Sequence, residues 1–342
     1  MTPTQGRAAR SAPRALAAMA IAIVAAACAA SGNAFAQAFP TQPIRILVPN
    51  PAGGPTDLAA RTFGDKLAAL LGQPVIVDYR PGGNGAVVNN ATIAAPADGH
   101  TIAMSTIGGQ VLTPVISSYL ANKRDVDAPK PLTPVSQLAE VALVLVVTPQ
   151  TGATNLRDFI AYAKARPGKL NFASTGVGGS DHLSMEMFNK AVGIEAVHIP
   201  NKGGVAAMNS MLAGETQFGF AASIGQVLPQ HQAGKLRIIA TGGSRRSVLL
   251  PDVPTIQDAA GLAGFDVASW IALFVRSETD KRIVARLSEA IQKAGEDNEL
   301  RTRLLTSGLE VRTTTPEAMA EKVDADYRKW SNLLFSSKIQ VN

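Results

Sequence analysis

The chain has 342 residues, 46% of them hydrophobic and 17% charged, and its 32 basic and 26 acidic residues leave a formal net charge of +6. Three of the basic residues lie in the first 36 residues, and without them the charge is a mild +3. Because the remaining basic residues are dispersed, nucleic acid is not an expected partner. The one cysteine, Cys28, cannot form a disulfide within the chain or hold a zinc finger or an iron–sulfur cluster.

The first 36 residues have the pattern of a cleavable export signal. Arg7, Arg10 and Arg14 form a basic segment without acidic residues, residues 15–30 are almost wholly apolar, and Ala34-Phe35-Ala36 supplies the small residues before a cut. The apolar segment is shorter than the roughly 20 residues of a membrane-spanning helix. We expect cleavage after Ala36 and a periplasmic protein, whose formal charge falls from +6 to +3 with the three arginines.

Lipid attachment at Cys28 is the alternative. The residue three positions before it is Ala25 rather than a larger aliphatic residue, and the segment contains no twin-arginine pair. We therefore prefer soluble export. The mature chain then has no cysteine, which excludes thiol catalysis, and its length of about 306 residues is ample for a core without disulfides.

The mature chain opens with a strand, a glycine-rich loop and a helix. Residues 44–48 form a β-branched run, residues 49–55 include Gly53 and Gly54, and an apolar face follows at Ala59, Phe63, Leu67 and Leu70. Glycines let the backbone come close to a ligand. The loop N–H groups and the start of the helix attract a carboxylate or phosphate.

Two similar units follow. Strands are predicted at 75–78 and 101–105, each followed by a glycine-containing loop, with a helix at 86–95 between them. Strands that alternate with helices indicate a parallel sheet with helices on both faces, in which ligands gather at the carboxyl ends of the strands.

A second α/β unit begins near residue 140. Residues 117–134, which are polar and rich in proline, are predicted as a surface excursion, and residues 141–147 as one strand buried on both faces. The remaining predicted elements are a helix at 156–163, strands at 170–174, 196–200, 218–220, 236–241 and 270–275, helices after the loops at 175–180 and 201–204, and two tail helices, the second beginning at Thr315-Pro316. We expect domain I at 38–139 plus 270–342 and domain II at 140–269.

Motifs for catalysis are absent from the sequence. No dinucleotide fingerprint, P-loop or G-x-S-x-G is present, and the four histidines are not at metal-ligand spacing. Asp181-His182 beside Ser180 is the one group that resembles catalytic parts, but sequence neighbours rarely face each other, and Ser180 is well placed as a helix cap. The pattern favours a binding protein that is not an enzyme and uses no metal or cofactor, with a periplasmic hydrolase as the remote alternative.

The loops resemble those of the Bug-type (TctC-like) solute-binding proteins of tripartite tricarboxylate transporters. The resemblance covers essentially the whole mature chain. It rests on Pro40-x-x-Pro43-Ile44-Arg45, Val48-Pro49-x-x-x-Gly53-Gly54-Pro55-Thr56-Asp57, Gly72-Gln73-Pro74-Val75-x-Val77, Arg80-Pro81-Gly82, Asp98-Gly99-His100-Thr101, Ala165-Arg166-Pro167-Gly168-Lys169-Leu170-Asn171, His198-Ile199-Pro200, Ala233-Gly234-Lys235-Leu236-Arg237 and Leu250-Pro251-Asp252-Val253-Pro254-Thr255.

The resemblance implies a two-domain periplasmic-binding-protein (Venus flytrap) fold. In each domain helices flank a central sheet, and the domains close on a small organic carboxylate. Such a receptor delivers its ligand to membrane subunits of the transporter and is expected as a monomer; a sensory binding protein that presents the ligand to a signalling partner is the alternative. By position, the implied ligand-binding residues are Ala52, Gly53, Thr56, Asp57, Thr106, Gly108, Ser174, Gly179, Ser180, Lys202, Gly203 and Ala221.

Three positions depart from the family pattern. Asn201 stands where many relatives have tyrosine, Asp181 where they have a small or hydroxyl residue, and Ala221 where they commonly have aspartate. A carboxylate at position 221 would pair with a ligand amine, so its loss disfavours amino acids. We expect a less polar pocket that suits an aromatic or aliphatic carboxylate.

Overall fold

The structure is a computed structural model that describes residues 39–124, 131–141, 143–221, 224–337, 339 and 341. Contacts divide the chain into Met1–Thr41 and Gln42–Asn342, and the second unit holds all the elements described below. The predicted export signal, its cleavage after Ala36 and the lipid alternative at Cys28 lie outside the described residues.

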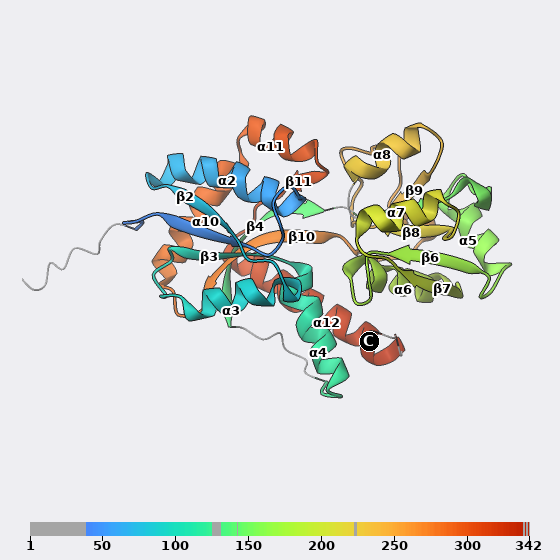
Figure 1. Ribbon diagram of the computed structural model, residues 1–342, viewed down its shortest axis with the longest axis horizontal. Helices are drawn as coiled ribbons and strands as arrows, with labels where there is room; N and C mark the ends of the chain where they lie inside the picture. The colour runs from blue at the N-terminus through green and yellow to red at the C-terminus, as the bar shows by residue number, and fades with distance from the viewer. Residues whose placement is uncertain are drawn as a thin grey trace, which may run out of the picture. The chain divides into compact units, whose positions relative to one another are not determined.

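The first sheet has six strands in the order β11-β4-β10-β3-β1-β2 (Figure 1). β1 pairs in parallel with β2 and β3, whereas β10 runs antiparallel to β3 and β4, and β11 antiparallel to β4. The strands are β1 (Ile44–Val48), β2 (Val75–Tyr79), β3 (Thr101–Thr106), β4 (Leu132–Val141), β10 (Ser269–Arg276) and β11 (Leu309–Val311). The helices that follow them are α2 (Pro55–Leu71), α3 (Ala86–Ala94), α4 (Thr113–Leu120), α10 (Lys281–Gly295), α11 (Asn298–Leu305) and α12 (Pro316–Ser337).

The second sheet has five strands in the order β7-β6-β8-β5-β9, with β6 parallel to β7 and β8, and β5 antiparallel to β8 and β9. The strands are β5 (Val144–Val147), β6 (Leu170–Ser174), β7 (Ala196–Pro200), β8 (Phe218–Ala221) and β9 (Arg237–Thr241). The helices are α5 (Leu156–Lys164), α6 (Ser180–Val192), α7 (Gly204–Leu212), α8 (Ile224–Gln232) and α9 (Ile256–Ala260). The predicted parallel pairing is right for β1 to β3 and β6 to β8. Both sheets are mixed, because β4, β5, β9, β10 and β11 run antiparallel to their neighbours.

Strand β5 shows why both faces of the second sheet are covered. Val144 and Val146 belong to the apolar cluster that contains residues of α7 and α8, whereas Leu145 and Val147 belong to the cluster that contains residues of α5 and α6. This alternation follows from the two-residue period of a strand. The prediction of a strand buried on both faces is confirmed for residues 144–147.

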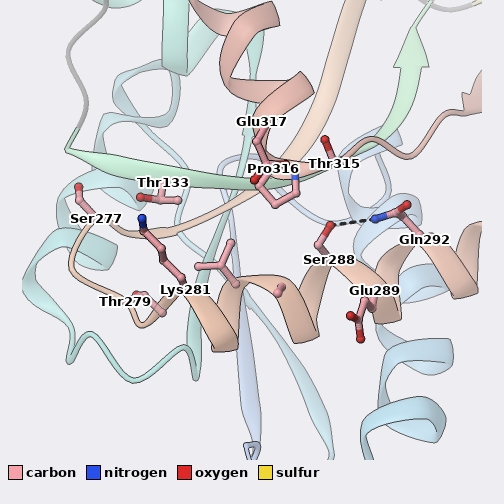
Figure 2. Close-up of a pocket in the computed structure, with 12 residues that line it drawn as sticks. Thr133, Ser277, Thr279, Lys281, Ser288, Glu289, Gln292, Thr315, Pro316 and Glu317 are labelled. Atoms are coloured by element: carbon pink, nitrogen blue, oxygen red, sulfur yellow. Dashed lines mark hydrogen bonds between the residues drawn. The ribbon is translucent and has the colours of Figure 1, made fainter.

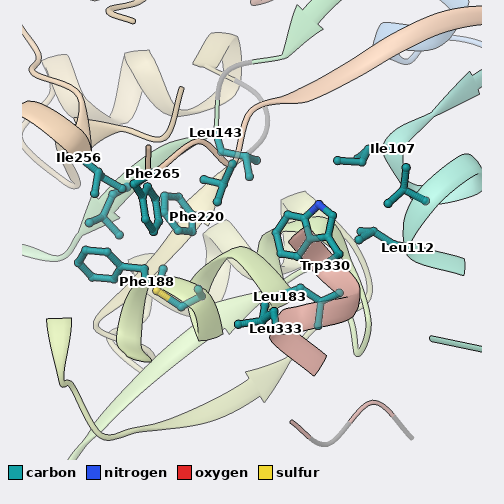
Figure 3. Packing of buried hydrophobic residues seen from close by; sticks show 14 of the residues in the cluster. Ile107, Leu112, Leu143, Leu183, Phe188, Phe220, Ile256, Phe265, Trp330 and Leu333 are labelled. Atoms are coloured by element: carbon teal, nitrogen blue, oxygen red, sulfur yellow. The ribbon is translucent and has the colours of Figure 1, made fainter. Parts of the chain in front are cut away.

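The larger cluster also contains residues that follow the first sheet. Ile107 and Leu112, just after β3, belong to it together with Trp330 of α12 and Leu183 of α6. Figure 3 shows the Trp330 indole between these groups. None of the described helices combines the length and apolarity that a membrane crossing requires.

The predicted single strand at 141–147 is wrong, because β4 ends at Val141 in the first sheet and β5 begins at Val144 in the second. No turn residue separates the two apolar runs, so the sequence does not signal the change of sheet. The predicted excursion at 117–134 is also wrong at its ends, where α4 finishes and β4 starts; residues 125–130 lie outside the described part.

Pro134 shows how proline fits inside β4. The register with β10 shifts between Leu273 and Phe274, opposite this proline, and β11 pairs only with residues 139–141. At Pro134 the strand is therefore an edge beside a bulge, where its missing N–H breaks no ladder.

The tail has a third helix, α11, that the sequence reading missed. Its signal was Asp297, whose side chain accepts from Leu300 N at 2.8 Å as an N-terminal cap. The predicted start at Thr315-Pro316 is confirmed, with Ala318 N donating to Thr315 Oγ1 at 3.2 Å. In α2 the buried face runs through Phe63, Leu67 and Leu71, whereas the predicted Leu70 is exposed.

Candidate ligand-binding site

The loop between β1 and α2 is held by Asp57. Gly53 lies at φ +95°, in the region that favours glycine, and Pro55 starts the helix after Gly54. The buried Asp57 carboxylate accepts from Gly53 N at 2.8 Å, Arg61 Nε at 2.7 Å and Tyr79 OH at 2.5 Å. The predicted Gly53 amide therefore donates to Asp57 in this structure.

Asp57 is ionised within this cluster. Burial alone would raise its pKa, but the hydrogen bonds from Tyr79, the Gly53 amide and Arg61 together outweigh burial and hold the pKa below its ordinary value. The ionised carboxylate therefore stabilises the conformation of the loop through these hydrogen bonds. Thr56, another predicted residue, is buried and donates from Oγ1 to Asn50 Oδ1 at 3.1 Å.

A cavity of about 50 Å³ lies where β1 and β3 end. Its lining is mostly polar and comprises Pro49, Asn50, Asn84, Gly85, Ser105 and Thr106. Ser105 is 1% exposed, and its hydroxyl has no hydrogen-bond partner among the described residues. A buried polar atom without a partner calls for a water or a ligand group, and this volume is large enough for either.

Asn84 closes this cavity from the loop after β2. It adopts φ +50° and donates from Nδ2 to Thr113 Oγ1 at 3.0 Å. The predicted Gly108 lies against it, because a Cβ there would come within 2.9 Å of Asn84 Oδ1. A side chain at position 108 would therefore require the Asn84 side chain to shift.

The loop at residues 174–180, between β6 and α6, is tied to the elements beneath it. Thr175 donates from N at 2.5 Å and from Oγ1 at 2.8 Å to Asp181, and Gly178 N donates to His182 Nδ1 at 3.1 Å. Ser174 Oγ lies 2.6 Å from His198 Nε2.

The Asp181 carboxylate thus faces the donors of its own loop. Burial raises its pKa, although the hydrogen bonds from Thr175 oppose that rise. Ser180 is not the helix cap that the sequence suggested: Gly179 takes the cap position, and Ser180 is the first residue of α6.

The loop at 201–204 lies beside the 174–180 loop. Asn201 N donates to Ser174 O at 3.0 Å, and Gly203 N donates to Thr175 O at 3.2 Å. Gly203 precedes α7 at φ +96°, and Lys202 is exposed. Ala221 ends β8 and packs against the cluster beneath α7 and α8; Ala222 lies outside the described residues.

A pocket of about 440 Å³ lies between the β1–α2 loop, the α11–β11 turn and the start of α8. It is lined by Gly53, Gly54, Pro55, Asp57, Leu58, Arg61, Gly225, Gln226, Thr306 and Ser307. Gln226 Oε1 would lie 3.9 Å from a Cβ at Gly204, which connects the pocket to the second-sheet loops.

A second hollow of about 440 Å³ lies at the other end of the first sheet (Figure 2). It is formed by one side of α10 and the starts of β4 and α12, and none of the predicted site residues line it. Because the loops that contain the predicted site residues do not line this hollow, we do not place the ligand site there.

Residues 59–338 match the TctC family, which is described as "Tripartite tricarboxylate transporter family receptor". The chain belongs to the TctC family. It is 31% identical over 299 residues to Protein BugT of Bordetella pertussis, covering 87% of this chain and 90% of that protein.

Solved structures agree with this assignment. MatC (Rpa3494) from Rhodopseudomonas palustris with bound malate is 29% identical, with a TM-score of 0.69 over 86% of this chain and 100% of that one. R. palustris Rpa4515 with adipate is 27% identical, with a TM-score of 0.71 over 88% of this chain and 99% of that one.

The expected fold class and family are therefore confirmed: this is a two-domain α/β solute-binding protein, and receptors of the TctC family are periplasmic. As a TctC-family member it is a binding protein and not an enzyme, so the hydrolase alternative is wrong. His182 takes the Gly178 amide and stacks on His198.

Of the predicted residues of this TctC-family protein, Gly53, Asp57 and Thr106 line the two cavities, and several lining residues were not predicted. Asn50, Asn84 and Ser105 at the first cavity and Gln226 at the larger pocket were not predicted. The first three follow or end predicted strands, which was the available signal. Nothing local to Gln226 indicated a pocket position.

Proposed function

We propose that this chain is a periplasmic receptor that captures a small organic carboxylate and passes it to the membrane subunits of a tripartite tricarboxylate transporter. The observation that supports this best is the 440 Å³ pocket where Gly53 and Gly54 meet Gly225 and Gln226, with the first cavity and its unpartnered Ser105 hydroxyl at the same strand ends.

The chemistry of the loops supports an anion that can be released. The two acids nearest the loops, Asp57 and Asp181, face internal donors and so do not repel a carboxylate from a free position. The other available groups are amides, hydroxyls and the Arg61 guanidinium, whose Nε already donates to Asp57. Among the predicted residues the exposed Lys202 is the one nearby cation. Neutral donors stabilise an anion without the strong binding of a buried ion pair.

We assign the predicted residues to this site as a proposal. They are Ala52, Gly53, Thr56, Asp57, Thr106, Gly108, Ser174, Gly179, Ser180, Lys202, Gly203 and Ala221. Malate and adipate, bound by similar proteins, are the first candidates. The lack of a carboxylate at position 221, which is alanine, supports a ligand without an amine.

The remaining parts of the proposal concern organisation and export. We propose domain I at residues 38–139 and 270–342 and domain II at 140–269, which the division of the strands between two sheets supports. We also propose a monomer exported by residues 1–36 and cut after Ala36.

A thermal-shift screen tests the ligand class, because a ligand that binds only the folded state raises the melting temperature. Malate, adipate and aromatic acids are compared with their alcohols and with amino acids of matched length. We expect a shift with an acid and none with its alcohol. No shift with any carboxylate would refute the proposal.

A further inference from the structure

Two stacked histidines lie beneath the 174–180 loop. His182 of α6 and His198 of β7 have ring centroids 3.8 Å apart and planes 12° apart. Phe172, the cross-strand partner of His198, stacks on it at 4.8 Å. His182 is 1% exposed and Phe172 is fully buried, whereas His198 is half-buried, so the stack extends from the core toward the surface.

Each ring contacts the loop through one nitrogen. Gly178 N donates to His182 Nδ1 at 3.1 Å, which requires this nitrogen to carry a lone pair. His198 Nε2 lies 2.6 Å from Ser174 Oγ, which in turn accepts from Gly176 N at 3.2 Å. The rings thus hold both ends of the loop.

The loop depends on these hydrogen bonds because its backbone adopts φ angles that few residues favour. Gly176 and Gly178 lie at φ +144° and +74°. Glycine makes these angles accessible but does not select them, since it populates many others. Hydrogen bonds from fixed partners are what choose one loop conformation.

We propose that His182, and through Ser174 also His198, are positioning residues that set the loop geometry on which ligand affinity depends. The effect on ligand affinity rests on the proposed function, whereas the positioning of the loop rests on the structure alone.

The charge around the pair fits this role. Among the described residues the titratable group in contact with the pair is Glu186, whose Oε1 lies 3.8 Å from His182 Nε2. The neighbouring Asp181 carboxylate is turned to Thr175, from which it accepts two hydrogen bonds. Burial raises the pKa of Glu186 and lowers the pKa values of both histidines to about 4, with mutual repulsion adding to the effect at His182. Both rings are neutral at pH 7, and protonation at Nδ1 would remove the acceptor for Gly178.

The test compares His182→Leu with His182→Asn. Leucine is similar in size and has no acceptor, whereas the asparagine oxygen can take the place of Nδ1. His231→Leu is the matched control, because His231 Nδ1 also accepts a backbone amide, from Ile238 at 3.4 Å, away from the loop. The readouts are the hydrogen-exchange protection factor of the Gly178 amide, measured by NMR, and the Kd for adipate and malate, measured by calorimetry.

We expect His182→Leu to lower the Gly178 protection factor and weaken acid binding, each about tenfold, because it leaves a donor unpaired. His182→Asn and His231→Leu should keep both values. In the wild type the protection factor should fall between pH 6.5 and 4, and in His182→Asn it should fall less.

Unchanged protection in His182→Leu would overturn the proposal, as would a loosened loop with unchanged affinity. If the wild type binds no carboxylate, the proposed function fails while the protection factors still decide the positioning role. If His182→Leu does not fold, His182→Asn and the wild-type pH series decide it.

Discussion

Replacement of Gly53 by valine separates the ligand site from the fold. A Cβ at Gly53 would have no atom within 4 Å outside its own neighbours, so the new side chain enters the 440 Å³ pocket without a clash. The change in stability then comes from the backbone, because φ is +95°. We expect a loss of about 1–3 kcal/mol in the free energy of unfolding.

Binding should change far more. The Gly53 amide already donates to Asp57, so the expected loss of affinity arises from valine carbons in the space of the ligand. Exclusion and poor desolvation of a bound carboxylate together weaken binding by a few kcal/mol, or about a hundredfold. Calorimetric titration with the acid from the thermal-shift screen measures this.

Gly72→Val is the matched control. Gly72 ends α2 at φ +72°, also with open space around its Cβ, and it lies outside the pocket. It should lose similar stability in urea unfolding and keep its affinity. If Gly53→Val binds as tightly as the wild type, or Gly72→Val weakens binding equally, the assignment of the β1–α2 loop is wrong.

Three further changes test the site and its charges. Ala221→Asp should weaken the binding of an acid without an amine tenfold to a hundredfold, measured by calorimetry. Like charges about 5 Å apart at an effective dielectric near 20 repel by roughly 3 kcal/mol before screening. Ser105→Ala should leave urea stability unchanged or raise it by about 1 kcal/mol, because its hydroxyl is buried unpaired, and should weaken acid binding. The pKa of His182 falls from 6.5 to about 4 on folding, so the neutral ring favours the folded state fully above pH 6.5 and less as the pH falls toward 4. The free energy of unfolding, measured in urea at each pH, should fall over this range by at most about 3 kcal/mol.

Each of these has a contrary result. Unchanged affinity in Ala221→Asp would place residue 221 outside the pocket and remove the argument against amino acids. Full affinity in Ser105→Ala would exclude its cavity from the site. A His182→Asn variant with the same loss of stability between pH 6.5 and 4 as the wild type would mean that other groups cause it.

The strands 44–48, 75–78 and 170–174 were predictable because each is a short β-branched or apolar run closed by turn residues. Such signals act through a residue's own backbone preferences and need no partner. The glycine loop at Gly53 was predictable for the same reason, since it follows the end of strand 44–48. Gly108, predicted in a loop, instead begins the helical segment Gly108–Leu112.

Tertiary structure decided what depends on distant partners. The change of sheet between Val141 and Val144 is set by pairing of β4 with β10, more than a hundred residues away in the chain, and apolar runs on both sides look alike in sequence. The hydrogen bond from Tyr79 to Asp57, the unpartnered hydroxyl of Ser105 and the stacking of His182 on His198 likewise depend on packing. The type of a residue fixes which hydrogen bonds its side chain can make. Only the folded chain determines which partners lie close enough to make them.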